Sequence, residues 1–177
     1  GNLREPKAGA KRAHVIVVTK CPEHMSGLEK TEITKRLNLE SRQALFFSSI
    51  QYSETLISAT SSRALADLQG RRFTLVTGIA NPKPLAIYLE EMGLDFEHLI
   101  YKDHHEFSQS DIRFWLKTCK EKGVNSIILT RKDWQRIKNN ELLNLLLNEG
   151  ININEIHTEV EILWNQKDEF LKLVYPL

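Results

Sequence analysis

Residues 73–101, FTLVTGIANPKPLAIYLEEMGLDFEHLIY, decide the fold. The run from Phe73 to Thr77 has no polar alternation, which is typical of a strand buried on both faces of a parallel sheet. The segment after it carries an apolar stripe at helical spacing, formed by Leu85, Tyr88, Leu89 and Met92. Gly93 ends this helix, and Phe96 to Tyr101 follows as a second strand. The stretch therefore predicts a strand, a helix and a parallel strand in succession.

The same alternation continues upstream. His14 to Thr19, HVIVVT, predicts a buried strand, and Ser26 with Glu29 forms a capping-box signature before a helix. Ala44 to Ser48 predicts another strand. Asn81 and Pro82 are expected to be the cap and first residue of the helix in the deciding stretch.

The alternation also continues downstream. Ser108 with Asp111 predicts the start of a helix, and Ser126 to Thr130 predicts a strand. Two short helices, a strand from Ile156 to Leu163 and a final helix from Gln166 to Val174 complete the pattern. The fold class is therefore α/β, with a mostly parallel sheet and helices on both faces.

Composition excludes some functions. The 24 basic and 23 acidic residues nearly cancel, so the chain lacks the basic field that drives nucleic-acid binding. Cys21 and Cys119 lie far apart in sequence with no second cysteine at zinc spacing beside either, and no metal site is predicted around them. No apolar run approaches the roughly 20 residues that span a bilayer, and this piece is expected to be soluble.

The phrase KDHHEF, residues 102–107, is the strongest candidate site because it follows a strand and holds consecutive histidines. Adjacent histidines rarely fill a core. Neutral imidazole can bind a metal, move a proton or stack on a purine, and Asp103 could orient His104 or His105 by a hydrogen bond.

Three other polar phrases have two readings each. Arg4 in GNLREP suits a phosphate or carboxylate. The phrase TGIANP, residues 77–82, could receive an anion at a helix start or be a plain tight turn. In LTRKDW, residues 129–134, Thr130 could cap a helix whose first turn, with Lys132 and Asp133, is simply solvated.

Phosphate-binding machinery is missing from this sequence. None of the eight glycines is followed by Lys, so a Gly-x-x-x-x-Gly-Lys-Ser/Thr loop does not occur. No two Asp residues are adjacent, so there is no obvious acidic cluster for magnesium. The chain on its own is therefore expected to be catalytically incomplete.

Five phrases in order, GNLREP, VVTKCP, TGIANP, KDHHEF and LTRKDW, resemble the tetraacyldisaccharide 4'-kinase family, and the resemblance spans essentially all 177 residues. It implies part of an ATP-dependent, Mg2+-requiring kinase in lipid A biosynthesis. The acceptor would be the 4' hydroxyl of tetraacyldisaccharide 1-phosphate, giving lipid IVA. The full protein would associate peripherally with the cytoplasmic face of the bacterial inner membrane.

The resemblance also implies an arrangement of domains. Residues 1–50 would be the tail end of an N-terminal P-loop kinase domain, residues 51–70 a linker ribbon, and residues 71–177 a C-terminal α/β/α domain. The chain would then be the C-terminal part of the kinase, without the P-loop half.

Site residues carry over by motif. Arg4 resembles the family arginine near the reacting phosphates, so it is the catalytic candidate. Asp103, His104 and His105 resemble the segment that touches the nucleotide, with His104 as the base contact. No metal ligand is assigned. Asn2 replaces an Arg that is common in the family phrase, and Arg131 stands where the family pattern has Glu, which leaves the roles of Thr130, Lys132 and Asp133 open.

Two other functions remain possible. The DHH phrase also occurs as a metal-binding corner of phosphoesterases that use two divalent ions. Such sites need further Asp and His ligands on neighbouring strands, and the remaining aspartates form no spaced cluster. The chain could also be a non-catalytic α/β module that binds a nucleotide.

Overall fold

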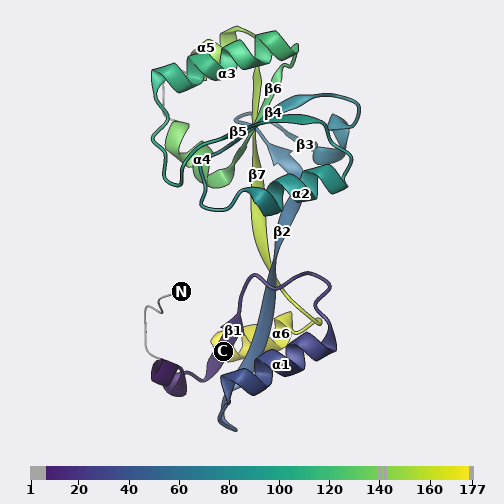
Figure 1. Cartoon of the computed structure of the whole chain (residues 1–177), viewed down its shortest axis with the longest axis vertical. Coiled ribbons are helices and arrows are strands. Elements are labelled where there is room, and N and C mark those ends of the chain that lie inside the picture. Colours follow the sequence, from purple (N-terminus) through teal and green to yellow (C-terminus); the bar gives the residue numbers. More distant parts are fainter. Residues whose placement is uncertain (1–6, 139–140, 142, 176–177) are drawn as a thin grey trace. The chain divides into compact units, whose positions relative to one another are not determined.

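The computed structural model describes residues 7–138, 141 and 143–175 (Figure 1). The chain divides into two compact units. Unit 1 combines the described part of residues 1–51 with that of residues 159–177, and unit 2 comprises the described part of residues 52–158. Two long strands, β2 (Ala44–Ile57) and β7 (Asn152–Ile162), each run through a boundary between the units and are neighbours in the strand order.

The sheet of unit 2 is mainly parallel. Its strand order is β7, β6 (Ser126–Thr130), β4 (Phe73–Thr77) and β5 (Phe96–Ile100). All three pairings between these strands are parallel. The short strand β3 (Ser62–Ala64) pairs antiparallel with the end of β2. This confirms the predicted α/β class.

Helices cover both faces of this sheet. On one face, α3 (Gln109–Lys122), α4 (Arg131–Ile137) and α5 (Leu143–Asn148) enclose a core that includes Val76, Ile127 and Leu129. On the other face, α2 (Lys83–Glu91) and the 3-10 helix η2 (Leu65–Leu68) pack with Leu75 and Ile128. Neighbouring residues of one strand enter different cores because side chains alternate across a sheet.

Unit 1 has a smaller core. Its strand β1 (Val15–Val18) pairs parallel with the start of β2. The unit also contains the 3-10 helix η1 (Lys7–Arg12) and the helices α1 (Gly27–Leu37) and α6 (Lys167–Val174). Within the described residues, its apolar cluster has three buried members, Met25, Phe47 and Leu163. The predicted capping box of Ser26 and Glu29 is present at the start of α1.

Two local predictions about β2 and α2 are wrong. Asn81 does not cap α2, because the helix begins at Lys83 and its N-cap is Pro82. Pro84 would stand at N3 after an Asn81 cap, and it has no N–H that the Asn81 side chain could accept from. The strand from Ala44 and the ribbon that follows it are one continuous strand, β2.

The two units divide the chain differently from the predicted domains. Residues 51–70 contain β3 and η2, and both Leu65 and Leu68 are buried in the core of unit 2. Residues 159–177 group with unit 1, where Phe170 lies edge-on against Phe46 and Trp164 lies edge-on against Phe47. Residues 52–70 thus group with unit 2, and the role of residues 51–70 as a linker ribbon stays a prediction.

Candidate functional site

Three of the polar phrases converge at the carboxyl ends of the parallel strands of unit 2. Gly78 directly follows β4, residues 102–105 follow β5, and α4 begins directly after β6. Ligands of open α/β sheets bind at this edge, because loops from neighbouring strands meet there. The candidate site is built from these three segments.

Asp133 anchors the site from within α4. It is fully buried, and its Oδ2 accepts hydrogen bonds from the backbone N–H of Gly78 at 3.0 Å and from the hydroxyl of Thr130 at 2.6 Å. Thr130 in turn caps α4 by accepting from the N–H of Asp133 at 3.2 Å. The interpretation of Asp133 as part of a solvated first turn is therefore wrong, whereas Lys132 is exposed.

Arg136 joins all three segments. Its Nη1 donates to Asp133 Oδ1 at 2.9 Å and to the carbonyl oxygen of Gly78 at 2.8 Å. Its Nη2 lies 3.2 Å from His104 Nδ1. The sequence analysis missed Arg136, although its position three residues after Asp133 places the two side chains on one face of a helix.

Gly78 lies where its neighbours leave little room for a side chain. A Cβ atom there would lie 3.0 Å from Asp133 Oδ1, 3.2 Å from Phe107 Cζ and 3.5 Å from Arg136 Nη1. The close packing explains why the turn after β4 has glycine at this position.

His104 projects from the loop after β5. Its side chain is 81% exposed, while its backbone N–H donates to the carbonyl oxygen of Gly78 at 3.2 Å. Its φ is +59°, a left-handed conformation that non-glycine residues rarely adopt. Asp103 Oδ2 lies 3.6 Å from His104 Nε2, beyond hydrogen-bond range, so the direct partner of the His104 ring is Arg136 and not Asp103.

His105 points to a different partner. Its Nε2 lies 3.0 Å from Asp111 Oδ2, and its ring packs against Tyr101 with centroids 4.6 Å apart. Asp111 also accepts hydrogen bonds from the backbone N–H and the hydroxyl of Ser108, both at 2.7 Å. The adjacent histidines therefore differ, because His105 is bound to the start of α3 whereas His104 faces solvent.

The described residues leave part of the predicted site undefined. Arg4 lies outside them. Among them, no three or more His, Cys, Asp or Glu side chains form a group that could hold a metal ion. The phosphoesterase alternative therefore gains no support from the part of the chain that the structure describes.

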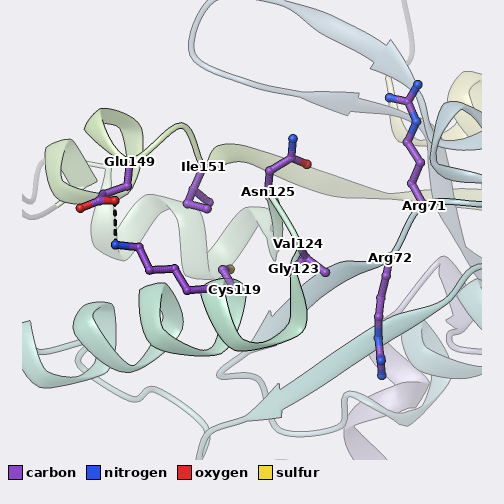
Figure 2. Close-up of a pocket in the computed structure, with 9 residues that line it drawn as sticks. Arg71, Arg72, Cys119, Gly123, Val124, Asn125, Glu149 and Ile151 are labelled. Atoms are coloured by element: carbon purple, nitrogen blue, oxygen red, sulfur yellow. Dashed lines mark ion pairs between the residues drawn. The ribbon is translucent and has the colours of Figure 1, made fainter.

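A surface pocket lies at the opposite edge of the unit 2 sheet, next to the residues that precede β4, β6 and β7 (Figure 2). Arg71 and Arg72 extend from it in different directions. Arg72 pairs with Asp95 and Glu97, and Lys120 Nζ lies 2.7 Å from Glu149 Oε2. Because its cations diverge or are already paired, this pocket is a weaker candidate than the carboxyl edge.

The fold and the site together define the class of the protein. It is a mainly parallel α/β protein with an exposed histidine, His104, at the carboxyl ends of its strands. The ring of this histidine contacts Arg136, which is hydrogen-bonded to the buried Asp133. Comparison with known proteins gives the family. The family model described as Tetraacyldisaccharide-1-P 4'-kinase matches residues 1–174. The chain belongs to the tetraacyldisaccharide 4'-kinase family.

Relatives agree with this assignment. A tetraacyldisaccharide 4'-kinase of Bacteroides fragilis is 38% identical over 184 residues, covering 96% of this chain and 47% of that protein. One from Flavobacterium johnsoniae is 37% identical over 147 residues, covering 82% of this chain and 42% of that protein. The chain spans about half the length of the curated relatives it matches.

A solved structure shares the fold. The crystal structure of the "apo" form of LpxK from Aquifex aeolicus in complex with ATP superposes with a TM-score of 0.58 at 17% identity. The superposition covers 99% of this chain and 46% of that one. At this identity the likeness supports the fold of the chain.

Proposed function

We propose that the chain is the C-terminal part of an ATP-dependent kinase of lipid A biosynthesis. The whole enzyme phosphorylates the 4' hydroxyl of tetraacyldisaccharide 1-phosphate and produces lipid IVA. The family match over residues 1–174 supports this reaction, and the activity belongs to a protein about twice as long as this chain. The observation that carries the proposal is the exposed His104 at the carboxyl edge of a family member's α/β unit.

His104 is the proposed contact to the nucleotide base, within the loop of Asp103, His104 and His105. An exposed imidazole with a fixed backbone can hydrogen-bond or stack on a purine without prior rearrangement. Asp103 adds an exposed carboxylate beside it, and His105 holds the loop to α3 through Asp111. ATP, when bound, supplies the phosphoryl group, and the role of this loop is to hold the nucleotide in place.

Apart from Arg4, the remaining catalytic machinery is proposed to lie in other parts of the full-length protein. Arg4 is the proposed catalytic cation near the reacting phosphates. No glycine of this chain precedes a lysine, and the described residues form no metal-ligand group. We therefore place the P-loop and the Mg2+ ligands outside this chain, with residues 1–50 as the tail end of the P-loop domain.

Membrane contact is proposed to be peripheral. Within the described residues, no helix has both the length and the apolar character needed to cross a bilayer. The acceptor is a lipid with four acyl chains, so the enzyme must work at a membrane surface. We place it at the cytoplasmic face of the bacterial inner membrane, where ATP is present, and expect no nucleic-acid partner.

The experiment that tests this function compares the 177-residue chain with the full-length protein. Each is mixed with radiolabelled ATP, Mg2+ and tetraacyldisaccharide 1-phosphate, and transfer of label to the lipid is measured. Transfer by the full-length protein, with none by the chain alone, is the expected result. Transfer by the chain alone, or no transfer by either, contradicts the proposal.

A further inference from the structure

The guanidinium of Arg136 connects three segments that are distant in sequence. It contacts Asp133 in its own helix, the carbonyl oxygen of Gly78 after β4, and the ring of His104 after β5. The Arg136 side chain is only 23% exposed, and its partner Asp133 is fully buried. A planar guanidinium held at two points has little freedom at the third, so the position of Nη2 beside His104 is fixed.

The contact with Arg136 determines which nitrogen of His104 carries the proton. Arginine can only donate hydrogen bonds, so His104 Nδ1, at 3.2 Å from Nη2, must accept. In the neutral imidazole the proton is then on Nε2. Asp103 Oδ2, 3.6 Å from Nε2, places a negative charge on that side of the ring, which also favours a proton there.

The backbone supports the same orientation. The N–H of His104 donates to the carbonyl oxygen of Gly78, the same oxygen that receives Arg136 Nη1. This bond holds the residue at its left-handed φ of +59°. Main chain and ring thus both contact one partly buried network, although the ring itself is exposed.

We propose that Arg136, held by Asp133, is a positioning residue that fixes His104 with its Nε2–H directed away from Arg136. The loop then offers a hydrogen-bond donor to its ligand, and the ligand atom that meets it is an acceptor, such as an unprotonated ring nitrogen. That the ligand is a nucleotide rests on the proposed function. The orientation of His104 rests only on the contacts of the chain.

The first test measures the orientation directly. The protein is labelled with 15N at histidine, and two-bond 1H–15N correlations at neutral pH report which ring nitrogen is protonated. His104→Gln identifies the signal of His104. A proton on Nε2 in the wild type supports the proposal, and a proton on Nδ1 overturns it. This readout requires no substitution at Arg136, so it does not depend on whether a variant folds.

The second test uses the two side-chain amides as partial mimics of histidine. In His104→Gln the amide nitrogen can occupy the position of Nε2, whereas in His104→Asn the amide oxygen can occupy that of Nδ1. In the full-length protein, we expect His104→Gln to keep a KM for ATP roughly fivefold below that of His104→Asn, the size of one hydrogen bond. If the KM of His104→Asn for ATP is equal to or below that of His104→Gln, the proposed orientation of Nε2–H is overturned.

A double-mutant cycle tests whether Arg136 acts through His104. Arg136→Lys keeps the charge beside Asp133 but loses the planar fork. It is expected to raise the KM for ATP roughly fivefold in the wild type and to leave it unchanged in the His104→Ala background. Equal effects in both backgrounds overturn the proposal. Arg113→Ala removes an exposed arginine of α3, outside the three segments of the candidate site, and should leave KM unchanged.

The outcomes separate the two proposals. If His104 carries its proton on Nε2 but His104→Ala does not change the KM for ATP, the proposed contact of His104 with the nucleotide fails while the orientation stands. If His104→Ala raises KM while Nδ1 carries the proton, the proposed function stands and the positioning role of Arg136 fails.

Discussion

Gly78 is the backbone position on which the candidate site depends. Its N–H donates to Asp133, and its carbonyl oxygen accepts from both Arg136 and His104. The space that a Cβ would occupy is bounded by Asp133, Arg136 and Phe107. Asp133 is fully buried and Phe107 belongs to the core on the α3 face, so neither can move aside freely.

Gly78→Ala should therefore destabilise unit 2. Adding a methyl group to a tightly packed position lowers the free energy of unfolding by about 1 to 3 kcal/mol. Gly27→Ala is the matched control, because nothing lies within 4 Å of a Cβ there and the residue begins α1, where alanine is favoured. Urea denaturation should show a lower midpoint for Gly78→Ala alone. A midpoint equal to that of Gly27→Ala would mean that the crowding around Gly78 has no energetic consequence.

At the scale of residues, the sequence predicted the location of the site better than its internal contacts. The DHH phrase and the turn after β4 could be found because polar residues follow buried strands. Arg136 could not be identified as a site residue from the sequence, because two of its three partners, Gly78 and His104, are distant in sequence. Asp133 was misread because a charged residue in a first helical turn is normally solvated, and only the tertiary fold buries it.

At the scale of elements, the start of α3 links helix stability to the candidate loop. Ser108 and Asp111 form a capping box, and His105 binds the same carboxylate. Burial acts to raise the pKa of Asp111, but the hydrogen bonds from the Ser108 backbone, His105 and the Ser108 hydroxyl outweigh it, and the pKa lies below its ordinary value. Asp111 therefore stabilises the folded state in its ionised form.

This pKa shift predicts a pH dependence. A carboxyl group whose pKa is lowered by folding contributes stability above its unfolded pKa, about 3.9, and loses it as the pH falls through the lower folded value. Asp111→Asn should thus destabilise the protein at pH 7 and flatten the loss of stability below about pH 4. Denaturation midpoints between pH 7 and pH 3 measure this. Parallel curves for wild type and Asp111→Asn would contradict it, and the exposed Asp95→Asn is the control.

Most helices and strands could be predicted from local patterns, and the exceptions have physical causes. Capping boxes and apolar stripes depend only on neighbours in sequence, so α1 and α3 were predicted with their caps. The existence of β3 depends on its pairing with the end of β2, such as Leu56 opposite Arg63, and β2 also pairs with β1 and neighbours β7. Both the end of β2 and β3 contain polar residues, so their apolar pattern did not predict this pairing.

At the scale of the whole molecule, the two units differ in the size of their cores. Unit 2 has two extensive buried clusters, one on each face of its sheet. The buried cluster of unit 1 contains three residues, and neither α1 nor α6 has a fully buried residue. Local stability follows buried apolar contact, so the units should open with different free energies.

Hydrogen exchange should reveal this difference. In the 177-residue chain, we expect the amides of β1 to exchange substantially faster than those of β5, although both are short strands at an end of the strand order with one parallel partner. Mass spectrometry of peptides covering Val15–Val18 and Phe96–Ile100 provides the comparison. Equal protection would mean that the small core of unit 1 does not limit its stability.

The composition of unit 1 from two separate segments could not be predicted. The sequence assigned residues 71–177 to one domain, because strands and helices alternate without a break there. The grouping of residues 159–177 with residues 1–51 depends on long-range contacts, including the pairs Phe46–Phe170 and Phe47–Trp164. Such contacts leave no local signal. The assignment of residues 1–50 to a P-loop domain stays a proposal.

The most direct test of the account is the steady-state kinetics of His104→Ala in the full-length protein, with ATP varied and the lipid acceptor saturating. We predict a KM for ATP raised roughly fivefold to tenfold, the loss of one hydrogen bond to the nucleotide. His24→Ala, which removes an exposed histidine of unit 1, should behave as the wild type. If His104→Ala matches His24→Ala in both KM and kcat, the exposed imidazole does not contact the nucleotide and the account is contradicted.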